Sequence, residues 1–255
     1  MPRAVYESDA ERGPPLTPPE QAYHERVSVA LPELRRRMQD AAVRSGRPAD
    51  AVRLLAVTKG HPLAAVRAAR AAGLCDLAEN RPESLVERRG AFPDPDVRWH
   101  LIGHVQRRKA PDAVEAAHLF HALDSVRLAE RLDRVADETG RRLPVLVQVN
   151  TSGEGSKGGF TVEEAPEALT RLVTLPGLLV RGLMTMAPFV EEEEPVRETF
   201  RRLRALHEDA RRAVAGYEGT ELSMGMTNDY EIAIEEGSTM IRIGTALFGE
   251  RIQAP

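Results

Sequence analysis

The sequence of 255 residues has one cysteine, few aromatic residues (4%), no excess of basic charge and no long apolar run. A lone cysteine, Cys75, cannot form an internal disulfide, so an oxidising compartment is not indicated. The formal net charge of −4 argues against a nucleic-acid or anionic-membrane partner. No apolar stretch approaches the ~20 residues that span a bilayer, and the N-terminus lacks a signal peptide's apolar segment. We therefore expect a cytoplasmic protein without a membrane or nucleic-acid partner.

The composition is that of a soluble globular protein, with 42% apolar and 29% charged residues. The length allows one large domain with a full core. Residues 1–19 combine charges with Gly13-Pro-Pro15 and Pro18-Pro19, and we expect them to form a flexible tail. A charged stretch from about Glu20 to Ser45 has helical apolar spacing and predicts an extra N-terminal helix. Residues 20–255 are then one domain.

Apolar segments alternate with amphipathic helical segments along the rest of the sequence. This alternation is typical of parallel βα units. Eight such units in about 200 residues favour a closed (β/α)8 TIM barrel, with a doubly wound open sheet as the alternative. Predicted strands are Leu54–Val57, Leu74–Ala78, Val97–Ile102, Leu119–Leu123, Leu143–Val149, Leu178–Met184, Glu221–Ser223 and Met240–Ile243.

Lys59 ends the first predicted strand, where burial makes a charged ammonium costly. The same desolvation lowers the pKa of a lysine amine and turns it into a nucleophile for carbonyl groups, which is Schiff-base chemistry. The alternative is an ordinary ion-paired lysine. In a barrel, chemistry is carried at the carboxyl ends of the strands, which is where Lys59 lies.

A second candidate site follows the last two predicted strands. Arg242 lies on the last strand, and Gly244-Thr245 form a turn directly after it. Glycine lets backbone approach a ligand closely, and N–H groups with a hydroxyl can satisfy phosphate oxygens. Ser223 ends the seventh strand, so the pair of strands matches the usual phosphate position in barrels. The plain alternatives are a simple turn and an Arg242 that pairs with a carboxylate such as Glu231.

Two other patterns are weak. Residues 153–158 match G-x-G-x-x-G, but no acidic residue closes a second strand about twenty positions on, so we interpret them as a rim loop. The seven histidines do not fall in a metal-binding pattern: His100 and His104 lie across a strand end, and His118 and His121 point to opposite faces of a strand. We expect no metal site.

In these and neighbouring stretches the sequence resembles the pyridoxal phosphate homeostasis protein family. The resemblance covers most of residues 50–251 in order, and its last two stretches are highly specific. The matching stretches are Leu55–Lys59, Ala78–Asn80, Trp99–Gly103 with Gln106 and Lys109, Leu123–Ser125, Gln148–Asn150, Ser156–Gly159, Arg181–Met184, Leu222–Met226 and Gly237–Gly249.

The resemblance implies a barrel like the N-terminal domain of alanine racemase, with pyridoxal 5'-phosphate (PLP) as the cofactor. It implies that Lys59 forms the internal aldimine, that Arg242 lies near the pyridine nitrogen and that Asn80 lies near the ring. Ser223, Gly244 and Thr245 would lie at the phosphate, with Met224 among the cofactor-binding residues. The sequence departs from the family at Gly60-His61 and Leu77-Ala78, beside the site.

Arginine opposite the ring nitrogen only donates hydrogen bonds, so it makes PLP a weaker electron sink than an aspartate would. Racemases on this barrel also need a second acid/base from another domain, and we expect none here because the sequence stops at Pro255, just past the last strand. We therefore predict a monomeric PLP carrier that stores the cofactor and delivers it to PLP-dependent apoenzymes, and not a turnover enzyme. The alternatives are a PLP-dependent racemase and a cofactor-free Schiff-base aldolase.

Overall fold

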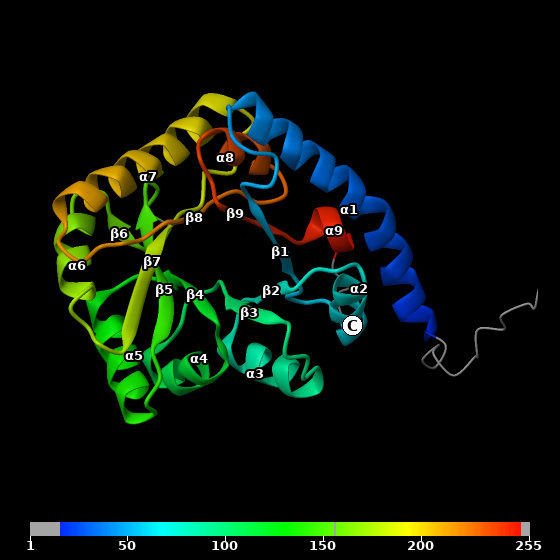
Figure 1. Ribbon diagram of the computed structural model, residues 1–255, viewed down its shortest axis with the longest axis horizontal. Helices are drawn as coiled ribbons and strands as arrows, with labels where there is room; N and C mark the ends of the chain where they lie inside the picture. The colour runs from blue at the N-terminus through cyan, green and yellow to red at the C-terminus, as the bar shows by residue number, and fades with distance from the viewer. Residues whose placement is uncertain (1–15, 156, 251–255) are drawn as a thin grey trace, which may run out of the picture.

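Parallel strands form the centre of the protein, and helices surround them (Figure 1). The computed structural model describes residues 16–155 and 157–250. The strands are β1 (Arg53–Val57), β2 (Asp76–Glu79), β3 (Arg98–Leu101), β4 (Leu119–Leu123), β5 (Leu143–Asn150), β6 (Phe160–Thr161), β7 (Leu178–Met184), β8 (Glu221–Ser223) and β9 (Met240–Ile243).

The strand order closes into a ring. The sheet runs β4-β3-β2-β1-β9-β8-β7-β5, and β4 also pairs with β5. Every pairing is parallel. The two-residue β6 pairs only with the last two residues of β5, Val149 and Asn150. The predicted (β/α)8 barrel is therefore confirmed, and the open sheet is wrong. All eight predicted strands are present, with ends that differ by at most two residues.

The helices of the described residues lie outside the barrel. Helices follow the strands as the alternation predicted, although the apolar spacing gave no residue limits for α3, α4 and the short α9. Few large apolar residues mark α3 and α4: α3 buries only Pro82 and Leu85, and α4 is rich in alanine. The helices are α1 (Pro18–Arg44), α2 (Leu63–Ala71), α3 (Pro82–Ala91), η2 (Arg107–Lys109), α4 (Ala110–Ala116), α5 (Val126–Glu138), α6 (Ala165–Leu172), α7 (Glu193–Ala213), α8 (Tyr230–Glu235) and α9 (Thr245–Phe248).

The core lies between the barrel and its helices. Strands of a parallel barrel are covered on both faces, which is why their sequences are nearly continuous apolar runs. All five residues of β4 are buried, for example. On α5 the buried residues Leu128, Leu132 and Val135 repeat at helical spacing and face the barrel. None of the helices in the described ranges has the length and apolarity to cross a membrane.

The extra helix α1 begins earlier than predicted. Most of the predicted tail over residues 1–19 lies outside the described residues, but Pro18 and Pro19 are already helical. Proline suits the first turn because its fixed φ is helical and its missing N–H has no partner there anyway. The Thr17 N–H donates to Glu20 Oε2 at 2.9 Å, which fixes this start. The tail therefore ends before Thr17.

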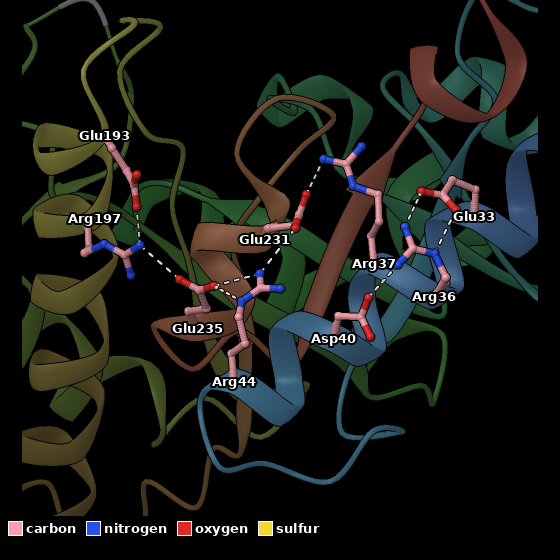
Figure 2. A network of polar contacts seen from close by, with 9 residues as sticks. All are labelled: Glu33, Arg36, Arg37, Asp40, Arg44, Glu193, Arg197, Glu231 and Glu235. Atoms are coloured by element: carbon pink, nitrogen blue, oxygen red, sulfur yellow. Dashed lines mark hydrogen bonds and ion pairs between the residues drawn. The ribbon is translucent and has the colours of Figure 1, made fainter.

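Helix α1 packs along α2, α8 and α9 and carries many charges (Figures 1 and 2). Arg44 Nε donates to Glu235 Oε1 of α8 at 2.9 Å, and Arg197 of α7 donates to the other Glu235 oxygen at 2.9 Å. Arg37 and Arg44 also pair with Glu231. We call these residues, with Glu193, the surface network. Because Glu231 faces α1, the alternative that pairs it with Arg242 is wrong.

Candidate functional site

A cavity of about 280 Å³ lies at the carboxyl ends of the barrel strands. Four of the predicted site residues line it: Lys59 follows β1, Arg242 lies on β9, and Gly244 and Thr245 form the turn into α9. Residues 183 positions apart in the sequence are brought together because β1 and β9 are neighbours, with Leu55 opposite Arg242. The barrel thus places an amine, a guanidinium and a glycine turn around one space.

Lys59 also lines a second, more polar cavity of about 420 Å³, on the side of β2 and α3. Asn80, which follows β2, lines this second cavity and is exposed, so the structure brings it close to Lys59 but outside the lining of the first cavity. Asn80 packs tightly on Gly103, where an added Cβ would lie 2.2 Å from the Asn80 carbonyl oxygen. That close approach explains the glycine in the Trp99–Gly103 stretch.

A buried carboxylate lies beside Lys59. Glu79 is 2% exposed, and Thr58 donates to its Oε1 at 2.6 Å. Burial raises the pKa of Glu79, against the opposing effects of Thr58, Arg88 and the charge of Lys59. Lys59 therefore lies in a polar cluster in which the positive charges of Lys59 and Arg88 offset the negative charge of the Glu79 carboxylate.

Arg242 is buried, with 5% of its surface exposed, yet it lines the first cavity. Its Nη1 donates to Ser223 Oγ at 2.7 Å, and its Nη2 donates to the Thr185 carbonyl at 3.0 Å. Burial lowers the pKa of Arg242 to about 10, which Asp229 opposes, so the group stays protonated at neutral pH. Two guanidinium nitrogens are thus held by the protein at the edge of the cavity.

Ser223 and Met224 do not line the cavity. Both are fully buried. The Ser223 hydroxyl lies between Arg242 and His121, and the Met224 N–H donates to the Met240 carbonyl at 3.2 Å. Ser223 therefore supports Arg242 of β9 through its hydroxyl and Met224 pairs with β9 through its backbone, and their predicted contacts with a cofactor stay predictions.

The glycine turn after β9 is held by the loop after β8. Gly225 has a positive φ of 96°, and a Cβ there would lie 2.6 Å from the Ala233 Cβ, so only glycine fits. The loop continues to Thr227, whose hydroxyl accepts a hydrogen bond from the Ala246 N–H at 3.4 Å. The turn and this loop together form one wall of the cavity.

Two titratable residues that were not among the predicted site residues also line the cavity: His61, which sequence reasoning had placed only beside the site, and Asp229, which it missed. His61 is buried, and its Nδ1 lies 3.1 Å from the Tyr23 hydroxyl of α1. Asp229 accepts a hydrogen bond from the Met226 N–H at 2.5 Å, and burial raises its pKa. Both follow the carboxyl end of a strand within a few residues, and this position was the available signal.

Sequence reasoning also missed a row of buried polar residues inside the barrel, which we call the histidine network: Asp76, His100, His121 and Ser223. His100 Nε2 lies 2.9 Å from Asp76 Oδ1, and its Nδ1 lies 2.9 Å from His121 Nε2. His121 Nδ1 lies 2.9 Å from Ser223 Oγ. The signal was a polar residue inside otherwise apolar strands.

The residues of the first cavity fit a phosphorylated aldehyde. The lysine amine can react with an aldehyde carbon, the guanidinium can donate to a ring nitrogen, and the Gly244-Thr245 turn offers backbone N–H groups and a hydroxyl to phosphate. Across residues 16–155 and 157–250, no group of three or more histidine, cysteine or carboxylate side chains could hold a metal ion.

Comparison with known proteins identifies the family of this chain. A protein of Aquifex aeolicus named pyridoxal phosphate homeostasis protein is 38% identical over 227 residues, which are 89% of this chain and 97% of the relative. Residues 29–252 match the family described as alanine racemase, N-terminal domain. The chain belongs to the pyridoxal phosphate homeostasis protein family. The resemblance stated from the sequence is thus confirmed.

Two solved structures are similar to this chain. PipY of Synechococcus elongatus is 38% identical, and its structure with PLP bound matches with a TM-score of 0.74 over 84% of this chain and 99% of PipY. An alanine racemase of Streptomyces coelicolor matches over 90% of this chain and 58% of its own, with 21% identity and a TM-score of 0.71. The latter likeness shows the shared barrel fold alone.

Proposed function

We propose that this protein binds PLP reversibly through Lys59 and takes part in intracellular PLP homeostasis, as a store that delivers the cofactor and not as a turnover enzyme. The observation that carries the proposal is the single cavity that joins Lys59, Arg242 and the Gly244-Thr245 turn. The relatives' name and the PLP bound to PipY support it.

Lys59 forms the covalent bond in this proposal. Its amine attacks the aldehyde carbon, a C=N bond replaces the C=O bond, and one water molecule leaves. Water or another amine reverses the reaction and releases the ligand. When bound, PLP would supply an aldehyde group that reacts reversibly with the Lys59 amine or with another amine. Thr245 and the N–H groups at the start of α9 hold the phosphate, and Arg242 orients the ring.

Two features of the cavity bear on the choice between storage and turnover. Arg242 only donates hydrogen bonds and keeps its own proton at neutral pH. It therefore does not protonate the pyridine nitrogen of PLP, as an aspartic acid would. A racemase needs an acid/base on each side of the substrate carbon. The cavity's candidate for the second base is the buried His61, whose Nδ1 lies 3.1 Å from the hydroxyl of Tyr23, a residue that does not line the cavity.

The deciding experiment is absorbance after incubation with PLP. We expect the purified protein to turn yellow, borohydride to bleach it, and mass spectrometry to find the reduced adduct on Lys59. Lys59→Ala should form no adduct, whereas Lys109→Ala, a lysine on η2 paired with Glu83 and Asp112, should behave as the wild type. A wild-type protein that forms no adduct on Lys59 would overturn the proposal.

Two further measurements separate the alternatives. Multiple-turnover exchange of amino-acid α-protons in deuterated water would favour the racemase, in which His61 is the cavity's candidate second base. Condensation of a phosphorylated sugar by a colourless protein would favour the aldolase. For delivery, we propose transient contact of the monomer with PLP-dependent apoenzymes, which transfer of PLP to an apoenzyme in the presence of a PLP-trapping phosphatase would test.

A further inference from the structure

The histidine network connects one end of the barrel to Arg242 at the other. Asp76 starts β2, His100 and His121 lie within β3 and β4, and Ser223 ends β8. Strands β4 and β8 are not neighbours in the sheet, so the contact between His121 and Ser223 crosses the barrel interior. At its outer end Asp76 accepts two hydrogen bonds from Arg98, at 2.7 and 2.6 Å. All four members are 7% exposed or less.

We propose that Asp76, His100 and His121 are positioning residues that act through the Ser223 hydroxyl to hold Arg242 in place for PLP. This inference rests on the proposed function, because Arg242 is its link to the ligand. It also gives the Ser223 side chain a task other than contact with the phosphate.

The direction of each hydrogen bond follows from Asp76. Its carboxylate is ionised, because the hydrogen bonds from Arg98 and His100 outweigh the effect of burial and hold its pKa well below the usual range. An ionised carboxylate only accepts, so His100 must donate from Nε2. Burial lowers the pKa of His100, and this histidine is neutral, which leaves its Nδ1 as an acceptor.

The same reasoning continues to Arg242. Since His100 Nδ1 accepts, His121 donates from Nε2. Burial and the nearby His100 and Arg242 lower the pKa of His121 well below its usual value, so it is neutral and its Nδ1 accepts. Ser223 therefore donates to His121, and its oxygen lone pairs face Arg242. Every donor in the network lies toward Arg242 and every acceptor toward Asp76.

This order has one consequence for the ligand site. A hydroxyl that is free to rotate could point its hydrogen at Arg242, but here the hydrogen is engaged by His121. Ser223 is thus fixed as an acceptor, and with the Thr185 carbonyl it holds two guanidinium nitrogens at once. Preorganisation of this kind increases affinity because the ligand does not have to order the side chain on binding.

The first test needs no ligand. Two-dimensional ¹H–¹⁵N spectra of ring-labelled histidines in the PLP-free protein distinguish the two neutral tautomers from each other and from imidazolium. We expect His100 and His121 to be neutral and protonated on Nε2 at neutral pH. A proton on Nδ1 of either ring, or a charged ring, would overturn the network direction and with it the proposal.

The second test measures the Kd of PLP by absorbance titration. His121→Phe keeps a ring but loses both nitrogens, and we expect about tenfold weaker binding, as for loss of support for one charged hydrogen bond. His121→Asn places an amide oxygen near Nδ1 and should recover most of the affinity. His207→Phe is the matched control, because His207 is also buried, with 6% of its surface exposed, and lies 2.8 Å from the Tyr217 hydroxyl but does not line the cavity.

The outcomes separate the two proposals. If the wild type binds PLP but His121→Phe binds as tightly as His207→Phe, the positioning role is wrong and the proposed function stands. Equal losses in His121→Phe and His121→Asn would point to packing, which also overturns the positioning role. If the wild type forms no PLP adduct, both proposals fail. Should His121→Phe not fold, the tautomers of His100 and His121 in the wild type decide the positioning role by themselves.

Discussion

The protein contains two polar networks of opposite design. The histidine network lies inside the barrel and uses one carboxylate and two neutral rings to reach Arg242. The surface network of Figure 2 lies between α1, α7 and α8 and consists entirely of charged side chains, such as Arg44, whose side chain is 50% exposed. Inside the protein a polar group that loses its partner destabilises the fold, because water cannot reach it to form a hydrogen bond. On the surface, water replaces any partner that is lost.

The difference shows that every polar atom needs a hydrogen-bond partner in the buried network but not in the surface network. Each nitrogen of His100 and His121 has one partner at 2.9 Å, so neither ring has a nitrogen left over. In the surface network Glu231 and Glu235 each meet more than one arginine, and several geometries are equally acceptable. We therefore expect the buried network to fix one arrangement and the surface network to contribute little to stability.

Removal of the buried carboxylate should have the largest effect. Asp76→Ala leaves Arg98 and the His100 Nε2–H without their acceptor, and we expect the free energy of unfolding to fall by about 3 kcal/mol. Urea denaturation measures this. Asp40→Ala is the control, since Asp40 pairs with Arg36 on the surface, and it should cost less than about 0.5 kcal/mol. Similar losses for both variants would contradict the contrast.

Acid should weaken the buried network before the surface network. His100 and His121 have lowered pKa values in the folded protein, so below about pH 6.5 the unfolded protein takes up protons that the folded protein does not. These two rings should account for about 2 kcal/mol of the fall in the free energy of unfolding from about pH 7 to about pH 5.5. His118 and His207, whose pKa values burial also lowers, add to the fall, so His207→Phe serves as the background for the comparison.

Glu235 of the surface network takes up its proton at lower pH than the histidines of the unfolded protein. Burial alone would raise its pKa, but hydrogen bonds from Arg197 and Arg44 outweigh burial and the pKa is lowered. Its contribution is present above its ordinary pKa near 4.5 and is lost only as the pH falls through its folded value. Denaturation curves recorded across this range test the order. A stability that stays constant down to about pH 5 would show that the buried rings are not neutral.

Loss of a surface pair should have the smallest effect. Arg44→Ala removes contacts with Glu231 and Glu235, and we expect a loss of about 0.5 kcal/mol that disappears in about 0.5 M NaCl. Thermal denaturation with and without salt measures it, with Arg35→Ala on the same helix as control. A loss of more than about 2 kcal/mol, insensitive to salt, would make the surface network as important as the buried one.

Much of the fold was predictable because parallel barrel strands are apolar on both faces and are separated by amphipathic helices. The strands Leu119–Leu123 and Leu178–Met184 have the predicted limits. The limits of helix α3 were not predicted because its charged sequence buries only two side chains. The start of α1 was placed too late because Pro18-Pro19 looked like tail, although proline fits the first turn of a helix.

Of the site, Lys59, Arg242 and Gly244-Thr245 were predictable because each follows or ends an apolar strand, and barrel strands end at one face. His61 was placed only beside the site and Asp229 was not predicted, because a loop residue gives no periodic signal that shows which way its side chain points. His100 and His121 were weighed as metal ligands, since their sequence spacing says nothing of a partner on another strand. Their pairing depends on the register of β3 and β4.

The sequence by itself determined the family resemblance, the alternation of strands and helices and the place of Lys59 at the end of the first strand, because apolar periodicity and the strand-end motifs are local properties of the chain. Only the tertiary structure decided what surrounds Arg242. Closure of the ring brings β4 across from β8, so that His121 can engage the Ser223 hydroxyl. No local pattern encodes that contact, because it joins residues 102 positions apart through the interior of the barrel.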